Sequence, residues 1–361
     1  MTWPNRGFLD LVGVDLPIIQ APMAGSSGAE MAIAVAKAGG LGSLPCALLS
    51  VEKMRAEIGV FRQRTDRSLN LNFFCHEPPE LDLDREAGWK DHLAGYYDEL
   101  GLDRSATANA PNRAPFDDAM CQIVEDARPE IVSFQFGLPA PDLLQRVKAT
   151  GAVVMGAATT VAEARWLENH GCDAIIAQGV EAGGHRGIFL GEDITTQPGT
   201  MVLVPQVVDA VSVPVIAAGG IADGRGVAAS LALGAAAAQV GTAYLFTPES
   251  LISDLHRAAL ATATDEETAV TNLFSGRPAR GLLNRLMREI GPMSDMAPAF
   301  PTAGGALAPL RVAAEAQGRA DFTNLWAGQA AALGHEMGAE AFTRCLAEDA
   351  ARQLTAIVPK T

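Results

Sequence analysis

Short apolar runs alternate with helix-like segments along the first 247 residues of the chain. The runs predicted as strands are residues 17–23, 41–45, 69–74, 131–136, 152–157, 173–177, 213–218 and 237–240. The segments predicted as helices are 29–38, 51–64, 142–149, 161–169 and 227–233. Apolar runs separated by helical segments are typical of parallel strands joined by crossover helices. Eight strands in series, without a G-x-G-x-x-G motif, predict an α/β fold, the closed (β/α)8 or TIM barrel, rather than an open doubly wound sheet.

Two segments fall outside this repeat. Residues 75–130, after the third predicted strand, are long and acidic and predict a helical insertion at the barrel rim. Such an insertion serves as a lid or pocket wall, or else for packing or dimerisation, and the sequence leaves these alternatives open. Residues 248–361 are Ala-rich and predict a C-terminal helical layer. We therefore expect residues 1–247 to form a cofactor-binding barrel and residues 248–361 to pack on it.

A glycine-rich stretch follows the sixth predicted strand. Residues 178–187 read Gln-Gly-Val-Glu-Ala-Gly-Gly-His-Arg-Gly. Strand ends are where parallel α/β proteins place their chemistry. Gly183 and Gly184 carry no side chains, so a flat ligand can approach the backbone while the imidazole of His185 faces it. The alternative is an ordinary glycine turn with a solvated histidine.

The next two strand ends also run into glycine. Ala218 precedes Gly219 and Gly220, and the eighth strand ends in Gly241 and Thr242. Backbone N–H groups at such turns form anion sites, and barrels commonly bind phosphate after strands seven and eight. The two junctions therefore predict a phosphorylated cofactor. Asp223 is interpreted as a helix cap.

Composition narrows the class of protein. The net charge of −15 argues against nucleic acid or an anionic membrane as the main partner, and no apolar run reaches the roughly 20 residues that span a bilayer. The five cysteines are dispersed, with no C-x-x-C pair, which favours reduced thiols and a cytoplasmic location. Glu181 and His185 are separated by two glycines, which disfavour a metalloprotease helix, so no metal is expected.

Several of these motifs together resemble the nitronate monooxygenase family, formerly called 2-nitropropane dioxygenases. The matching segments are 17–23, 71–76, 178–187, 217–220 and 325–329. The resemblance implies an FMN-dependent barrel that oxidises alkyl nitronates with dioxygen to a carbonyl compound and nitrite. An FMN-dependent NAD(P)H:quinone or enoyl-thioester reductase of the same barrel type is the alternative, and a non-redox isomerase or aldolase is a more distant one. Assembly as a homodimer is left open.

The resemblance also assigns roles to residues. It implies that His185 is the catalytic residue and hydrogen-bonds or charge-pairs with the nitronate oxygens, or takes the carbon proton of a neutral nitroalkane. The cofactor-binding positions are expected to be Ala21, Pro22, Met23, Asn72, Gln178, Gly183, Gly184, Ala218, Gly219, Gly220, Gly241, Thr242 and Gln329. Asn72 and Gln178 each offer a donor and an acceptor for the pyrimidine edge of the flavin. Met23 has an alternative reading as a core gap-filler.

The substrate end departs from the family pattern. Relatives often carry a tyrosine in a Pro-Tyr-Pro-like segment, whereas residues 297–301 here read Ala-Pro-Ala-Phe-Pro, so Phe300 lacks the hydroxyl. His76, after the third strand, is the other residue expected in the substrate pocket. An ordinary surface histidine is the alternative for His76.

Overall fold

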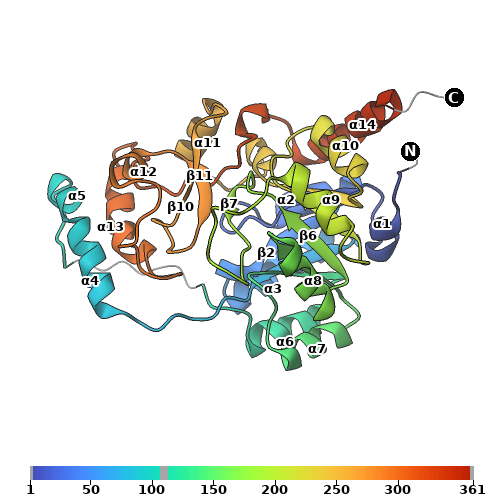
Figure 1. Cartoon of the computed structure of the whole chain (residues 1–361), viewed down its shortest axis with the longest axis horizontal. Coiled ribbons are helices and arrows are strands. Elements are labelled where there is room, and N and C mark those ends of the chain that lie inside the picture. The colour runs from blue at the N-terminus through green and yellow to red at the C-terminus, as the bar shows by residue number, and fades with distance from the viewer. Residues whose placement is uncertain (1–2, 106–112, 358–361) are drawn as a thin grey trace.

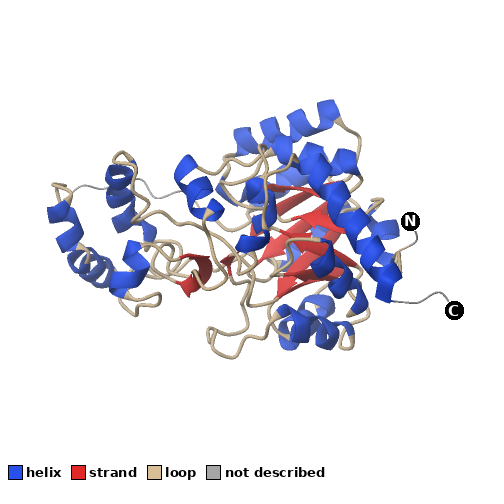
Figure 2. Cartoon of the chain, turned by 90° about the horizontal axis from the view of Figure 1, so that it is seen from above, coloured by secondary structure: helices blue, strands red, loops and turns tan. Residues whose placement is uncertain are grey.

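Eight parallel strands form the central barrel. The computed structural model describes residues 3–105 and 113–357, and its large sheet has the order β1-β9-β8-β6-β5-β4-β3-β2. The strands are β1 (Ile18–Gln20), β2 (Gly42–Pro45), β3 (Leu69–Phe74), β4 (Ile131–Gln135), β5 (Val153–Ala158), β6 (Ala174–Gln178), β8 (Val215–Ala218) and β9 (Ala237–Val240). A parallel bridge between Ile19 and Leu41 joins β1 to β2 and closes the ring. The predicted (β/α)8 barrel is confirmed (Figures 1 and 2).

Helices cover the outside of the barrel. They are α2 (Ala29–Ala38), α3 (Val51–Arg64), α6 (Asp118–Ala127), α7 (Pro141–Ala149), α8 (Val161–Asn169), α9 (Thr200–Val208), α10 (Gly224–Ala232) and α14 (Ala339–Ile357). Side-chain caps fix several N-termini: Ser50 accepts from the N–H of Lys53, and Asp223 accepts from the N–H of Gly226. The predicted capping role of Asp223 is therefore confirmed. Within the described residues, no helix is both long and apolar enough to cross a membrane.

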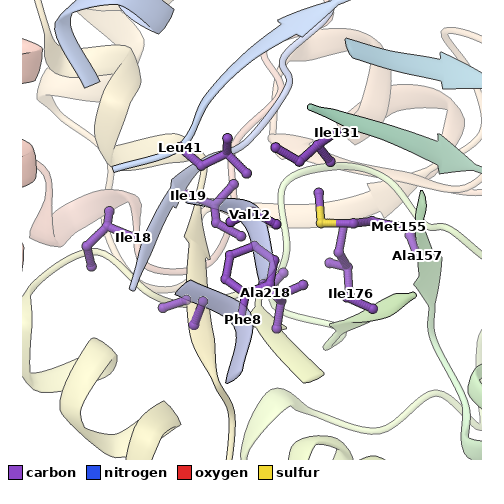
Figure 3. Close-up of a cluster of buried hydrophobic side chains, with 14 of the residues drawn as sticks. Phe8, Val12, Ile18, Ile19, Leu41, Ile131, Met155, Ala157, Ile176 and Ala218 are labelled. Atoms are coloured by element: carbon purple, nitrogen blue, oxygen red, sulfur yellow. The ribbon is translucent and has the colours of Figure 1, made fainter. Parts of the chain in front are cut away.

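The amino ends of the strands are closed by α1 (Gly7–Val12). Its Phe8 and Val12 belong to the same buried cluster as Ile19 and Met155 of the barrel strands (Figure 3). The hydroxyl of Ser68, just before β3, donates to the carbonyl of Val12 at 2.6 Å. Because this end is plugged, a ligand site has to lie at the opposite, carboxyl end of the barrel.

The 75–130 segment has two parts. Helix α6 packs on α3 and α7, with Met120, Ile123 and Val124 buried on the barrel, so it is the barrel helix that follows β3. Only α4 (Leu83–His92) and α5 (Ala94–Glu99) leave the barrel. They pack with α12 (Arg285–Ile290) and α13 (Gly304–Glu315) around buried Trp89 and Leu310, away from the barrel (Figure 1).

The C-terminal segment is more than a helical layer. It contains β10 (Thr268–Thr271) and β11 (Ala279–Leu282), which form a small antiparallel sheet with β7 (Gly184–His185). Helix α11 (Asp254–Ala261) precedes this sheet, and the final helix, α14, returns to pack between α2 and α10. The small sheet brings residues from 275 onwards against the loop that carries His185.

Candidate active site

A cavity opens at the carboxyl ends of the barrel strands. Its predicted lining residues are Ala21, Pro22, Met23, Asn72, Gln178, Gly183, Gly184, His185, Ala218, Gly219, Gly220, Gly241 and Thr242. They come from the ends of β1, β3, β6, β8 and β9, which are far apart in sequence. The barrel therefore brings these candidate residues together around one space.

Three predicted site residues lie elsewhere. The side chain of Gln329 is exposed, although its neighbours Gly328 and Ala330 line the cavity. Phe300 and His76 are buried beside the lining, with ring centroids 4.7 Å apart, and the ring of Phe300 lies 5.4 Å from that of His185. Phe300 thus packs against both histidines, and the Gln329 amide does not face the cavity.

The glycines at the ends of β8 and β9 form a tight cradle. Gly219 and Gly220 have φ values of +112° and +68°, which side-chain-bearing residues rarely adopt. A Cβ at Gly219 would lie 2.8 Å from the hydroxyl oxygen of Thr200. The hydroxyl of Thr242 accepts from the N–H of Gly328 at 2.9 Å, which leaves its own hydrogen available to a ligand. This end of the cavity offers donors and no side-chain bulk, as an anion requires.

Five side-chain amides border the cavity, those of Asn72, Gln135, Gln178, Gln239 and Asn324. The Nδ2 group of Asn72 donates to Ser133 Oγ at 3.0 Å, which leaves Oδ1 available to a ligand. Gln178 uses both ends of its amide internally, donating to the carbonyl of His185 at 3.1 Å and accepting from the N–H of Gly187 at 2.8 Å. It therefore fixes the histidine loop and has one hydrogen left for a ligand. Sequence reasoning missed Gln239 inside an apolar run. Its buried Oε1 has no hydrogen-bond partner among the described residues.

One hydrogen bond orients His185. Its Nε2 lies 2.9 Å from Ser275 Oγ, and that hydroxyl donates to the carbonyl of Arg277 at 3.2 Å. With the hydroxyl hydrogen directed to that carbonyl, the Ser275 oxygen accepts from Nε2–H, and Nδ1 carries the lone pair. We assign the imidazole this tautomer. Ser275 lies 90 residues from His185, and no local pattern in the sequence pointed to it.

The surroundings keep His185 uncharged. Burial holds the pKa of the imidazole well below its usual value, and the nearby cations of Arg113 and Arg277 lower the pKa further. His76 has a pKa lowered to about 4 for the same reasons. Both shifts favour the neutral imidazole at neutral pH in the absence of a ligand. Hydrogen bonding or charge pairing between His185 and an anion stays a prediction.

The charges of the side chains around the cavity decide what chemistry they can perform. His185 presents a neutral base to the cavity, and Arg113, which sequence reasoning also missed, lines the same space. Glu181 accepts from the N–H and hydroxyl of Thr200, so it caps α9. Among the described residues, no group of histidine, cysteine or carboxylate side chains could hold a metal ion.

Known proteins share this architecture along its whole length. Residues 6–348 match the family model for nitronate monooxygenase. The chain is 42% identical to a nitronate monooxygenase of Pseudomonas aeruginosa, over 95% of this chain and 98% of that protein. It is 41% identical to one from Paraburkholderia phytofirmans, over 93% and 92% of the two chains.

Solved structures point the same way. A nitroalkane oxidase from Streptomyces ansochromogenes superposes with a TM-score of 0.88 at 38% identity, covering 98% of this chain and 100% of that one. FabK from Thermotoga maritima gives a TM-score of 0.73 at 27% identity, covering 99% of each chain. With the family match and the more similar relatives in agreement, this chain belongs to the nitronate monooxygenase family.

Proposed function

We propose that the protein uses FMN to oxidise alkyl nitronates with dioxygen, giving a carbonyl compound and nitrite. The observation that carries the proposal is the placement of His185, which lies on one cavity with the glycine cradle of β8 and β9. One end of this cavity suits a phosphate and the other a small substrate. A nitronate and dioxygen are the small-molecule partners, and a homodimer stays a prediction.

The residues present fit a flavin mononucleotide. Gln239 Oε1 is buried without a partner, and the free Oδ1 of Asn72 faces the same cavity. Both are acceptors for the N–H or hydroxyl groups of a cofactor, since a buried polar atom needs a partner. Gly219, Gly220 and Thr242 would hold the single phosphate. When bound, the flavin supplies the electron transfer between substrate and dioxygen.

The role of His185 depends on the protonation state of the substrate. A nitronate has already lost its carbon proton, so it needs no base. A neutral nitroalkane still carries that proton, and the lone pair on Nδ1 of His185 can accept it. Ser275 holds the ring in the tautomer in which this nitrogen is free.

The reductase alternative has weaker support. The chain is 41–42% identical to the two relatives named nitronate monooxygenase and 27–28% identical to the two FabK structures. The higher identity and the His-bearing motif therefore favour nitronate chemistry, although the barrel itself is common to both. We also place the enzyme in the cytoplasm, since its five cysteines are free in the described structure.

Oxygen uptake by the FMN-loaded protein tests the proposal. Ethylnitronate is added to one cell and NADH to a parallel anaerobic cell. We expect rapid oxygen uptake with nitrite release from the nitronate, and little flavin reduction by NADH. Flavin bleaching by NADH, with no response to the nitronate, would contradict the proposal and favour the reductase.

A further inference from the structure

Arg113 determines the charge of the cavity. Among the described residues that line it, Arg113 and His185 are the ionisable side chains, and there is no aspartate or glutamate. His185 is neutral because its pKa is held well below the usual value. The guanidinium of Arg113 is thus the charged group that a ligand meets there.

Among the described residues, this guanidinium has no acidic partner. Burial and the nearby cation of Arg311 both lower the pKa of Arg113, and no carboxylate opposes them. Arg146 and Arg285 each pair with more than one carboxylate, whereas the buried guanidinium of Arg186 has no salt bridge within the described structure and donates to two carbonyls and to Gln197. Burying a charge without a partner is costly, so an unpaired cation on a cavity wall indicates an anionic ligand.

Arg113 lies at the substrate end of the cavity. Its Cζ is 5.7 Å from the centroid of the Phe300 ring, and the same ring lies 5.4 Å from the imidazole of His185. Phe300 also packs against Phe74 at the end of β3. In the closed strand order, β3 and β4 lie across the barrel from β8 and β9, which carry the glycine cradle. The cofactor phosphate and Arg113 therefore occupy opposite sides.

We infer that Arg113 binds and orients the anionic nitro group of the nitronate, an inference that rests on the proposed function. A planar guanidinium matches two oxygens of a planar anion with a pair of hydrogen bonds. His185 contacts the same aromatic ring, so the substrate carbon is held near the imidazole. A neutral nitroalkane has no net charge to pair, so Arg113 makes the enzyme prefer the nitronate.

Two substitutions at this position test the inference with matched substrates. R113M removes the charge and keeps the length of the side chain, whereas R113K keeps the charge and loses the planar fork. We expect R113M to lower kcat/KM for ethylnitronate by about 10²-fold, with FMN content unchanged. Nitroethane becomes the same anion once its carbon proton is removed, so its turnover should fall as well. The kcat/KM of R113K for ethylnitronate should lie between those of wild type and R113M. The control is R67M, which removes an exposed arginine paired with Asp15 at the plugged end of the barrel.

Nitrate binding gives a readout that does not need turnover. Nitrate is a planar, inert anion, and its binding to the FMN-loaded protein is followed by the change in flavin absorbance. Wild type and R67M should bind nitrate, and R113M should bind it at least tenfold more weakly. If wild type releases no nitrite from ethylnitronate, the proposed function fails, and nitrate still decides the role of Arg113. Equal nitrate binding by wild type and R113M, or an unchanged kcat/KM of R113M for ethylnitronate, would overturn the inference.

Discussion

The imidazole of His185 works in an unusually apolar enclosure. The rings of Phe136, Phe300 and Trp326 lie with centroids 5.4–5.9 Å from it, and its single polar side-chain partner among the described residues is Ser275. Apolar packing favours the neutral imidazole, and the serine selects its tautomer. A base at Nδ1 is therefore available at neutral pH without a carboxylate partner.

Replacing His185 by asparagine should affect a neutral nitroalkane and a nitronate to different extents. We expect H185N to retain FMN, because the glycine cradle that is proposed to hold the phosphate is unchanged. Turnover of nitroethane should fall by about 10²-fold or more, since its carbon proton then lacks a base. Turnover of ethylnitronate should fall less. Steady-state oxygen uptake with the two substrates measures this, and unchanged nitroethane turnover would rule out His185 as the base.

Ser275 is predicted to act through His185 as a positioning residue. In S275A the Nε2–H group loses its acceptor, so we expect kcat with nitroethane to fall by about tenfold. The acceptor stabilises the charged imidazole more than the neutral one, so its loss lowers the pKa of His185. The acid limb of the pH profile of kcat/KM should therefore move to lower pH. S230A, which removes a buried hydroxyl on α10, is the control and should leave this limb in place.

Sequence reasoning found the residues that lie on local motifs and missed the others. His185 and the glycines follow predicted strands, and barrel geometry then places strand ends together. Gln239 was read as part of an apolar strand, although its side chain faces the cavity. Ser275 and Arg113 reach the site from distant segments, so only the tertiary structure shows their neighbours.

At the scale of elements, the loop that carries His185 (residues 179–187) is fixed by its own side chains to the end of β6 and to the start of α9. The buried guanidinium of Arg186 donates to the carbonyls of Gln178 and Gly179, at 2.8 and 2.6 Å, and to Gln197. Glu181 ties the same loop to the start of α9. The contacts of Arg186 and Glu181 thus fix this loop, and with it the position of His185 relative to the glycine cradle.

The cradle itself is sensitive to a single methyl group. We expect G219A to cost about 1–3 kcal/mol in the free energy of unfolding, because the positive φ is strained for alanine. FMN affinity should fall as well, since the Cβ would press on Thr200. Urea unfolding and FMN fluorescence titration measure the two effects. G59A on α3, where a Cβ meets nothing within 4 Å, should instead leave FMN binding unchanged.

The bounds of barrel strands and helices were predictable where the apolar pattern and a capping residue indicate the same ends. The strand at 69–74 and the helices at 29–38, 51–64 and 161–169 have the predicted bounds, because the strand is buried throughout and Ser50 and Thr160 cap two of the helices. The small sheet was missed. Its strands are short, and β7 pairs with residues 279–280, nearly a hundred positions away. The domain division at residue 247 stays a prediction.

For the whole molecule, buried neutral histidines link stability to pH. His256 on α11 is 6% exposed, and burial lowers its pKa to about 4. In the unfolded chain a histidine has a pKa of about 6.5. The unfolded state therefore binds the proton first as pH falls. The free energy of unfolding should decrease by about 1.4 kcal/mol per pH unit for each such histidine, between pH 6.5 and pH 4.

H256N tests this linkage because asparagine can still donate to the carbonyl of Trp326, which the histidine contacts, but does not titrate. Urea unfolding at pH 7, 6 and 5 should show a shallower decline in the free energy of unfolding for H256N than for wild type. Surface carboxylates are the same in the two proteins, so their contributions cancel in the comparison. The pKa of Glu99 is lowered to about 2 by Arg285 and Arg319, so its contribution is lost only below about pH 4.5. Parallel pH dependences in the two proteins would show that His256 is already able to accept a proton in the folded state.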